Sequence, residues 1–287
     1  MTAHFGFRPG KRPPPAEGLP LYSLITIVRN AAGTLERTLR SVERQSYPAI
    51  EYIVVDAGST DGTVELLAAH EHLITRWCSE PDGGHADGAN KGVQAATGRF
   101  IGFVYADDWL PDDFVETSVA ALTRDGGGGT PDFVFGDLNL YKDGVYAFTL
   151  RGDPDYRRKM SYRVPMLNFP TVSAGRHVYE RAGLYDTGYK VVPDSDWLVR
   201  VNKAGLIGAH DPAVGYNFSF GGHSTKNIGR VYVETAQSIV RHGGDPVKTW
   251  AHALVRIAFH TLDGMLRERV SLRTYTRIRS IRKAITG

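Results

Sequence analysis

Short apolar runs alternate with amphipathic segments over roughly the first 105 residues of the chain. Four runs are rich in β-branched and aromatic residues, which is typical of buried strands: 24–28, 52–55, 74–78 and 100–104. Leu35, Leu39 and Val42 recur at helical spacing after the first run, and helices are also predicted at 63–70 and before Gly98. This alternation is typical of a parallel sheet with helices on both faces. The sequence therefore predicts an α/β fold with a mainly parallel central sheet flanked by helices.

The pattern becomes less regular after Pro111. Helices are predicted at 111–124 and 194–205, and strands at 133–135 and 145–150. Asp143 and Gly144, just before the second of these strands, are a typical hairpin turn. The last 50 or so residues are predicted to form arginine-rich helices.

Three regions are predicted from these elements. Residues 1–20 contain four prolines beside Lys11 and Arg12, so we expect a flexible leader that does not pack. Residues 21–225 are expected to form one large domain, and residues 226–287 a C-terminal helical extension.

Composition excludes several classes of protein. With 42% apolar and 23% charged residues, the chain is not wholly disordered. A formal net charge of +3 is too small to indicate a nucleic-acid partner, and no segment resembles a base-reading motif. The single cysteine, Cys78, excludes an internal disulfide and a cysteine-based zinc site, and it fits a reducing, cytoplasmic compartment. No apolar run is long enough to span a bilayer.

Polar and acidic residues follow each of the first four predicted strands. Arg29, Asp56, Asp82 and Asp107 all lie just beyond strand ends. The carboxyl ends of parallel strands meet at one edge of a sheet, and ligands bind there. We therefore expect these side chains to surround a ligand.

Asp107 and Asp108 are adjacent carboxylates that repel each other unless a positive charge lies nearby. Oxygen ligands suit Mg²⁺ or Mn²⁺, so the pair predicts a metal site. The alternative is that Asp108 caps the following helix. We favour the metal for Asp107.

The other strand ends each have two interpretations. Asp56 can accept hydrogen bonds from a nucleotide, or it can stabilise its own loop. Asp82 precedes two glycines that allow close backbone approach to a ligand. Lys91, on the next predicted helix, can reach a phosphate or face solvent.

Two later segments carry further candidates. Asp194 and Asp196 open a predicted helix, where a carboxylate can serve as a rigidly held general base or as a cap. His223 follows two glycines and can bind a metal or a diphosphate, although a surface loop is the commoner setting for such a histidine.

Taken together, these segments resemble the family 2 glycosyltransferases of the GT-A fold, a Rossmann-like nucleotide-diphospho-sugar transferase fold. The resemblance runs from about Ser23 to Thr225. No single motif in it is specific for the family, but the order and spacing of the motifs together are. Seven segments carry it: 26–30, 52–63, 79–84, 87–92, 96–98, 106–108 and 194–196.

The resemblance implies roles for individual residues. Thr26 and Arg29 match the first nucleotide-binding loop, and Asp56 matches the carboxylate that contacts the base. Asp107 matches the last acid of the metal-binding Asp-x-Asp motif, with Asp108 beside it. Asp194 matches the catalytic base.

The chain departs from the family pattern at two positions. Tyr105 stands where many members have an acid or Asn, which puts the number of direct metal contacts in doubt. Pro193 stands where many have Glu, which keeps Asp196 as a second choice for the base.

The implied activity is inverting, hexosyltransferase-type sugar transfer from a nucleotide-diphosphate sugar to a hydroxyl acceptor. The implied acceptor is a glycan, a glycolipid or a lipid-linked precursor of an envelope polysaccharide, and the implied cofactor is Mn²⁺ or Mg²⁺. A catalytically impaired sugar-nucleotide-binding protein is the main alternative. A dinucleotide-dependent oxidoreductase ranks far behind, because the first strand is not followed by its glycine motif.

The C-terminus raises a separate hypothesis about the membrane. Seven basic residues crowd the stretch 267–283, and apolar residues recur among them at helical spacing. Such a helix can lie on the anionic inner face of a membrane or pack on the protein's own core. The sequence alone leaves both interpretations open.

Overall fold

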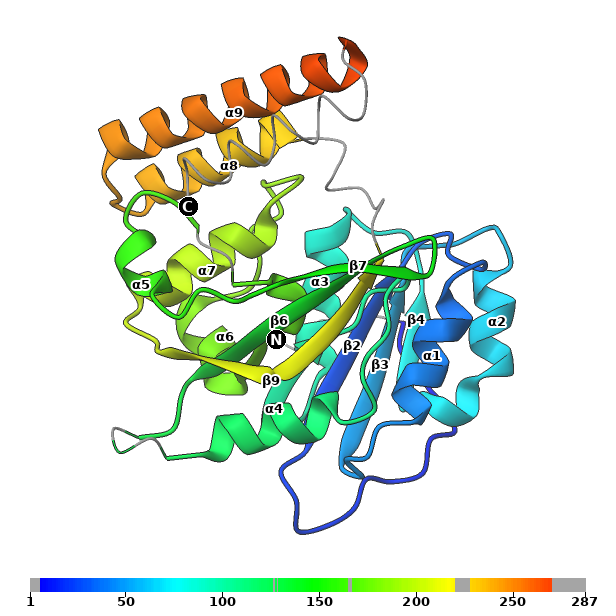
Figure 1. Cartoon of the computed structure of the whole chain (residues 1–287). Coiled ribbons are helices and arrows are strands. Elements are labelled where there is room, and N and C mark those ends of the chain that lie inside the picture. Colours follow the sequence, from blue (N-terminus) through cyan, green and yellow to red (C-terminus); the bar gives the residue numbers. More distant parts are fainter. Residues whose placement is uncertain (1–5, 126, 128, 165–166, 220–227, 270–287) are drawn as a thin grey trace.

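The computed structural model describes residues 6–125, 127, 129–164, 167–219 and 228–269. In that part, nine strands form one sheet in the order β1-β4-β3-β2-β5-β8-β6-β7, with β9 beside β6 (Figure 1). The strands are β1 (Arg8–Pro9), β2 (Tyr22–Val28), β3 (Ile50–Asp56), β4 (Arg76–Ser79), β5 (Phe100–Phe103), β6 (Phe133–Lys142), β7 (Val145–Leu150), β8 (Ser173–Gly175) and β9 (Gly208–Ser219). The α-helices are α1 (Leu35–Glu43), α2 (Thr63–Ala69), α3 (His85–Ala95), α4 (Phe114–Thr123), α5 (Tyr156–Lys159), α6 (Arg176–Ala182), α7 (Pro193–Lys203), α8 (Ile228–Arg241) and α9 (Pro246–Arg269), with 3-10 turns η1 (Glu71–Leu73) and η2 (Phe169–Thr171).

One half of the sheet is parallel, as the sequence predicts. β2 lies between β3 and β5 and is parallel to both, and β4 continues in the same direction beside β3. The other half is mixed: β8 is antiparallel to β5 and β6, β7 is antiparallel to β6, and β9 is parallel to β6. The predicted hairpin is confirmed, because Asp143 and Gly144 both have positive φ, at 51° and 78°.

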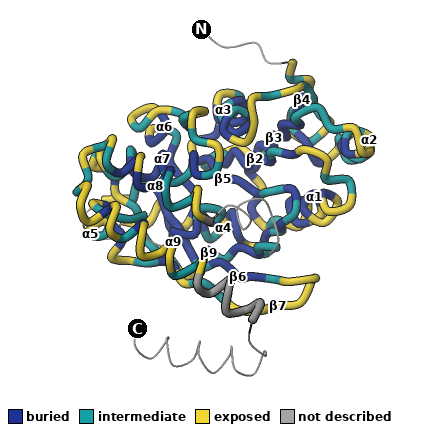
Figure 2. The backbone as a smooth tube through the Cα atoms, turned by 90° about the horizontal axis from the view of Figure 1, so that it is seen from above, coloured by how far each residue is buried: buried dark blue, intermediate teal, exposed yellow. Residues whose placement is uncertain are grey.

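The central strands bury both of their faces. Leu24 and Tyr52 pack into one cluster with α1, α2 and α4. Ile25 and Ile53, the next residues along, pack into a second cluster with α3, α6 and α7. Figure 2 shows the dark buried positions concentrated along these strands. The result is a three-layer arrangement, in which the sheet lies between two layers of helices.

The expectation of a leader that does not pack is wrong for residues 8–12. Arg8 and Pro9 pair with β4, and the Arg8 guanidinium lies 3.5 Å from the centroid of the Trp77 ring. Gly10 N–H donates to the carbonyl of Thr75 at 3.0 Å, and the Lys11 ammonium is 2.9 Å from the Glu71 carboxylate. β4 would otherwise present an unpaired edge of the sheet, so this short segment protects it.

Besides β1, two strands were not predicted from the sequence, for identifiable reasons. β8 has only three residues, which is too short for a periodic pattern. β9 contains Pro212 and two glycines, which weaken a strand signal, and its pairing with β6 is interrupted by a register shift between Phe135 and Asp137. Pairing with β6 overrides that weak local preference.

The predicted C-terminal helices are confirmed as α8 and α9, which lie side by side (Figure 1). The basic and apolar stretch expected at 267–285 lies outside the described residues beyond Arg269, as does the predicted boundary at residue 225. Within the described part, no helix combines the length and the apolar composition needed to cross a membrane.

Candidate active site

A cavity of about 1040 Å³ lies beyond the carboxyl ends of β2, β3 and β5, where the sequence predicts ligand binding. Its wall is completed by α7, α8, α9 and the segment around η2. Five of the residues singled out from sequence line it together: Arg29, Asp82, Asp107, Asp108 and Asp194. A pair of glycines allows the predicted Asp82 loop, since Asp82 Oδ1 accepts the Gly84 N–H at 2.8 Å and Gly84 has a positive φ of 108°.

Asp107 and Asp108 differ in what surrounds them. Asp108 is fully buried, and its carboxylate accepts hydrogen bonds from the Tyr216 hydroxyl at 2.9 Å and the Ser219 N–H at 2.7 Å. Asp107 is half-buried, and no ion pair or side-chain hydrogen bond holds its carboxylate within the described residues. Burial raises the pKa of Asp107, and burial together with the Asp107 charge raises the pKa of Asp108 to about 8.

Helix α1 holds this acidic loop from one side. Arg37 donates to the carbonyl of Asp107 at 2.7 Å, and the Thr38 hydroxyl donates to the carbonyl of Asp108 at 2.7 Å. The Arg37 guanidinium also lies 3.9 Å from the centroid of the Trp109 ring. The loop's backbone is therefore fixed, and Asp107 is left facing the cavity.

Tyr105 stands between the two acidic regions. Its ring centroid is 5.4 Å from that of His85, and its N–H donates to the Tyr216 hydroxyl at 3.0 Å. Burial, followed by the charges of Asp194 and Asp108, raises the pKa of Tyr105 far above its ordinary value. The position supplies a neutral phenol, which is a weaker metal ligand than a carboxylate.

Asp194 lies in the first turn of α7 and lines the cavity. Pro193 occupies the first position of that helix, where its fixed φ and missing N–H are compatible with helical geometry. The half-buried Asp194 carboxylate accepts the Ser195 N–H at 2.8 Å, and burial raises its pKa to about 6. A carboxylate with such a pKa is suited to accept a proton near neutral pH.

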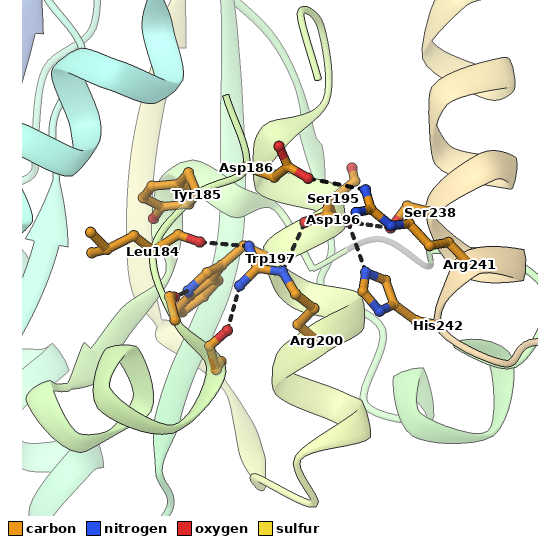
Figure 3. Close-up of polar contacts among 12 residues, drawn as sticks. Leu184, Tyr185, Asp186, Ser195, Asp196, Trp197, Arg200, Ser238, Arg241 and His242 are labelled. Atoms are coloured by element: carbon orange, nitrogen blue, oxygen red, sulfur yellow. Dashed lines mark hydrogen bonds and ion pairs between the residues drawn. The ribbon is translucent and has the colours of Figure 1, made fainter. Parts of the chain in front are cut away.

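Asp196, the second choice for the base, is a buried structural residue (Figure 3). It accepts hydrogen bonds from Arg200 at 2.8 Å and Ser238 at 2.7 Å, and the His242 Nε2 lies 3.2 Å away. Arg200 donates in addition to the carbonyls of Ala182 and Leu184. These contacts occupy both oxygens of Asp196 and do not leave it free to receive a proton from a substrate.

Glu234 of α8 supports the site from outside the cavity wall, and sequence reasoning missed it. One of its oxygens accepts three backbone N–H groups, from Lys190, Val191 and Val192, at 3.2, 2.9 and 3.3 Å. Its other oxygen accepts Arg230 Nε at 2.6 Å. Nothing in the sequence pairs α8 with the loop before α7, so only the fold reveals this contact.

Three other predicted residues do not reach the cavity wall. Thr26 is fully buried, and its hydroxyl donates to the carbonyl of Val104 at 2.8 Å. The buried Lys91 ammonium lies 2.9 Å from Glu80 and 3.9 Å from Asp87. Asp56 is buried at the end of β3, where its carboxylate accepts hydrogen bonds from Ser59 and Ser79. In this structure Thr26 and Lys91 contact the surrounding scaffold and Asp56 stabilises its own loop, and the predicted contacts of all three with a nucleotide stay predictions.

The predicted metal ligands at the cavity provide only part of the coordination that a divalent metal ion needs. Within the described residues, no three His, Cys, Asp or Glu side chains come close enough to form a metal cage. His223, the other predicted ligand, lies outside those residues. Mg²⁺ and Mn²⁺ can be held by one carboxylate plus phosphate oxygens and water, and the Asp107 carboxylate meets that requirement.

Comparisons with known proteins agree with this arrangement. The sequence profile described as "Glycosyl transferase family 2" matches residues 23–187, more than half of the chain. An uncharacterized glycosyltransferase of Mycobacterium tuberculosis is 41% identical over 109 residues, which are 37% of this chain and 42% of that protein. The match therefore spans less than half the length of that relative.

Two longer matches are more distant. A protein of Mycobacterium bovis named "PGL/p-HBAD biosynthesis glycosyltransferase" is 28% identical over 232 residues, covering 78% of this chain and 87% of the relative. The solved structure of the mannosyltransferase PcManGT from Pyrobaculum calidifontis, in complex with GDP-Man and Mn²⁺, has a TM-score of 0.59 and 19% identity. It covers 97% of this chain and 84% of its own, and it shows that the two share a fold.

The contrast between Asp196 and Asp194 gives a stability prediction. Asp196→Ala leaves the partly buried Arg200 without its carboxylate, so the free energy of unfolding should fall by about 3–5 kcal/mol. Asp194→Asn removes a charge that burial disfavours, so it should leave that free energy unchanged or raise it. Urea denaturation of both variants checks this, and equal destabilisation would show that Asp196 does not have the structural role described.

Proposed function

The chain belongs to glycosyl transferase family 2, and from this premise we propose that it transfers a sugar from a nucleotide-diphosphate sugar to an acceptor hydroxyl, with inversion at the anomeric carbon. The observation that carries the proposal is that Asp107 and Asp194 reach one cavity from different elements. One follows β5 and the other begins α7. This arrangement supports a donor-binding role for Asp107 and a base role for Asp194 around a common space large enough for two substrates.

The donor is proposed to lie at the strand ends. Arg29, Asn30 and Ala31 follow β2 along the cavity wall, and Asp82 and Gly84 face the same space. Arg29 supplies a positive charge for a diphosphate, and the glycine lets a ligand approach the backbone closely. Contact between Asp56 and the nucleotide base stays a prediction, because the Asp56 carboxylate also serves Ser59 and Ser79.

The cofactor is proposed to be Mn²⁺ or Mg²⁺ held by Asp107. When bound, such an ion stabilises the negative charge of the leaving nucleoside diphosphate. The similarity in fold to a mannosyltransferase solved with GDP-Man and Mn²⁺ supports this. Asp108 holds the loop in place through Tyr216 and Ser219, and it keeps Asp107 in position.

Asp194 is proposed to take the proton of the acceptor hydroxyl as that oxygen attacks the anomeric carbon. The bond from the anomeric carbon to the diphosphate oxygen breaks in the same step, so the sugar's configuration inverts. No covalent intermediate with the enzyme is required, and no side-chain nucleophile is needed. Glu234 and Asp196 fix the start of α7, which keeps the base in one orientation.

The alternative function is a sugar-nucleotide-binding protein with impaired catalysis. Tyr105 favours it, since a neutral phenol replaces an acid next to the proposed metal site. Retention of a cavity-lining Asp194 with a raised pKa favours an active enzyme. We therefore rank transfer first.

The acceptor is proposed to be a glycan, a glycolipid or a lipid-linked precursor made on the inner face of the membrane. Similarity to a protein named for PGL/p-HBAD biosynthesis supports a biosynthetic role. Helix α9 adds a reason for peripheral membrane contact, because Val247, Trp250, Leu254 and Val255 share one side of it and are exposed.

The role of Asp194 predicts loss of transfer without loss of donor binding. Asp194→Asn should lower kcat by about 10²–10⁴-fold, because the amide cannot accept the proton. In the wild type, kcat should fall as the pH drops through about 6, since the base must be ionised and its pKa is raised to that value. Steady-state kinetics with a panel of nucleotide sugars measures both.

Asp186→Asn is the matched control, since Asp186 pairs with Arg241 and does not line the cavity. It should keep wild-type kcat and the same pH profile. Full activity of Asp194→Asn would contradict the assignment of the base.

The proposed metal site predicts sensitivity to chelation. Transfer should stop in excess EDTA and return with Mn²⁺ or Mg²⁺, and Asp107→Asn should lose about 10²-fold or more in kcat because a neutral amide holds a divalent ion much more weakly than a carboxylate. Asp113→Asn, a change at an exposed acid six residues along, should behave like wild type. Undiminished transfer in EDTA would refute the metal.

Membrane contact through α9 predicts selective binding to vesicles. Val255→Glu should reduce co-sedimentation with anionic vesicles, because it places a negative charge in the contacting face. Val145→Glu on β7 is the control, since the two valines are similarly exposed, at 67% and 69%. Equal sedimentation of both variants would show that α9 does not touch the membrane.

A further inference from the structure

The cavity has two chemically different ends. All of the carboxylates in its wall, Asp82, Asp107, Asp108 and Asp194, come from strand ends or from the start of α7. The remaining wall, from α8, α9 and residues 162–170, contains no acid in the part that the structure describes. It is built mainly from apolar and aromatic side chains, among them Val164, Phe169, Ile239 and Ala253.

An aromatic cluster closes this second end. The His252 ring of α9 lies between Tyr162 and Tyr232, with centroid distances of 6.2 and 6.4 Å and edge-on geometry to both. Burial, followed by the charges of Arg163 and Arg256, lowers the pKa of His252, so this ring is neutral at pH 7. The wall therefore favours an apolar group.

Arg163 brings a positive charge into the same wall. Its guanidinium carbon is 5.8 Å from the centroid of the Tyr162 ring, and the side chain is half-buried. In the described part of the chain it forms no ion pair, and its Nε is buried without a hydrogen-bond partner. A partly buried cation without an anion is costly, so an anionic group entering the cavity would be stabilised there.

Two further polar atoms in this wall lack partners. Asn168 and Thr249 are 6% and 1% exposed, and both line the cavity. Asn168 Nδ2 donates to the carbonyls of Gly136 and Leu150, which leaves its Oδ1 unpaired, and Thr249 Oγ1 is also unpaired within the described residues. Unpaired buried atoms beside a cavity are expected where a polar ligand completes the hydrogen bonding.

We propose that this second end of the cavity, defined by Arg163, Asn168, Thr249 and the Tyr162–His252–Tyr232 cluster, binds an acceptor that carries an anionic group next to an apolar one. The inference rests on the proposed function, because it names the acceptor class of the same site. The acidic end is assigned to the donor and its metal ion, so the acceptor's negative group lies toward Arg163. Its hydroxyl is then directed toward Asp194, across the shared space.

Two chemical sources fit this description, a phosphate attached to an alkyl chain and a carboxylate attached to an aromatic ring. Calorimetric titrations of the full chain use octyl phosphate and 4-butylbenzoate as probes. Octanol and 4-butylbenzyl alcohol are the uncharged controls, and inorganic phosphate is the control without an apolar group. At least one charged amphiphile should bind about tenfold or more tightly than its uncharged control and than inorganic phosphate. Tighter binding of octyl phosphate indicates the phosphate source, and tighter binding of 4-butylbenzoate indicates the carboxylate source.

Variants test whether Arg163 is responsible. Arg163→Gln should weaken binding of the charged probe about tenfold or more and leave its uncharged control unaffected, while Arg163→Lys should recover part of the affinity. Arg158→Gln is the matched control, an exposed arginine five residues away that does not line the cavity, and it should bind like wild type. Equal binding of charged and uncharged probes, or equal behaviour of Arg163→Gln and Arg158→Gln, would overturn the proposal.

A parallel assay of nucleotide-sugar turnover separates this inference from the proposed function. If a charged probe binds through Arg163 but no nucleotide sugar is consumed, the anion-binding role of the second end of the cavity is retained and the transferase function fails. If transfer occurs to an uncharged acceptor and Arg163→Gln leaves the KM for that acceptor unchanged, the transferase function is retained and the anion-binding role of the second end of the cavity fails.

Discussion

The buried carboxylate of Asp196 holds together the parts of the molecule that form the cavity. It lies on α7 and is bound by Arg200 of the same helix and by Ser238 and His242 at the end of α8. A buried charge is tolerated only when its hydrogen bonds are satisfied, so these partners must stay in place in the folded state. Together with the contact of Glu234 to the preceding loop, this fixes α8 against α7 at two points.

The chemistry of the site follows from that attachment. The hydrogen bonds of Asp196 hold α7 in one orientation. In that orientation Asp194, two residues earlier in the first helical turn, faces the cavity. The same attachment brings α8, and α9 packed against it, over the far side of the cavity. That wall is apolar and carries a cation, whereas the strand ends are acidic. One cavity thus holds two environments suited to two different substrates.

Sequence analysis succeeded where the chemistry is local. Arg29, Asp56 and Asp107 lie at the ends of buried strands or just beyond them, and alternation of strand and helix is enough to place them at one sheet edge. It could not show the long-range partners of other predicted residues, whose contacts with a nucleotide stay predictions. Lys91 has the right position for a phosphate ligand, but Glu80 from the preceding loop binds it, and Thr26 packs against Tyr52 inside the sheet. The leader was misjudged for the same reason, since the edge of β4 that it covers cannot be seen from its own composition.

The sequence by itself determined the α/β class, the parallel half of the sheet, the hairpin and the acidic edge, because periodicity, turn residues and strand ends are local properties. The tertiary structure alone decided which of two neighbouring acids, Asp194 or Asp196, lines the cavity. In a helix the two carboxylates are only two residues apart but point in different directions, so their surroundings differ. The Asp196 carboxylate is bound by Arg200, Ser238 and His242, whereas Asp194 lines the cavity. Packing of α8 on α7 is what brings Ser238 and His242 to Asp196.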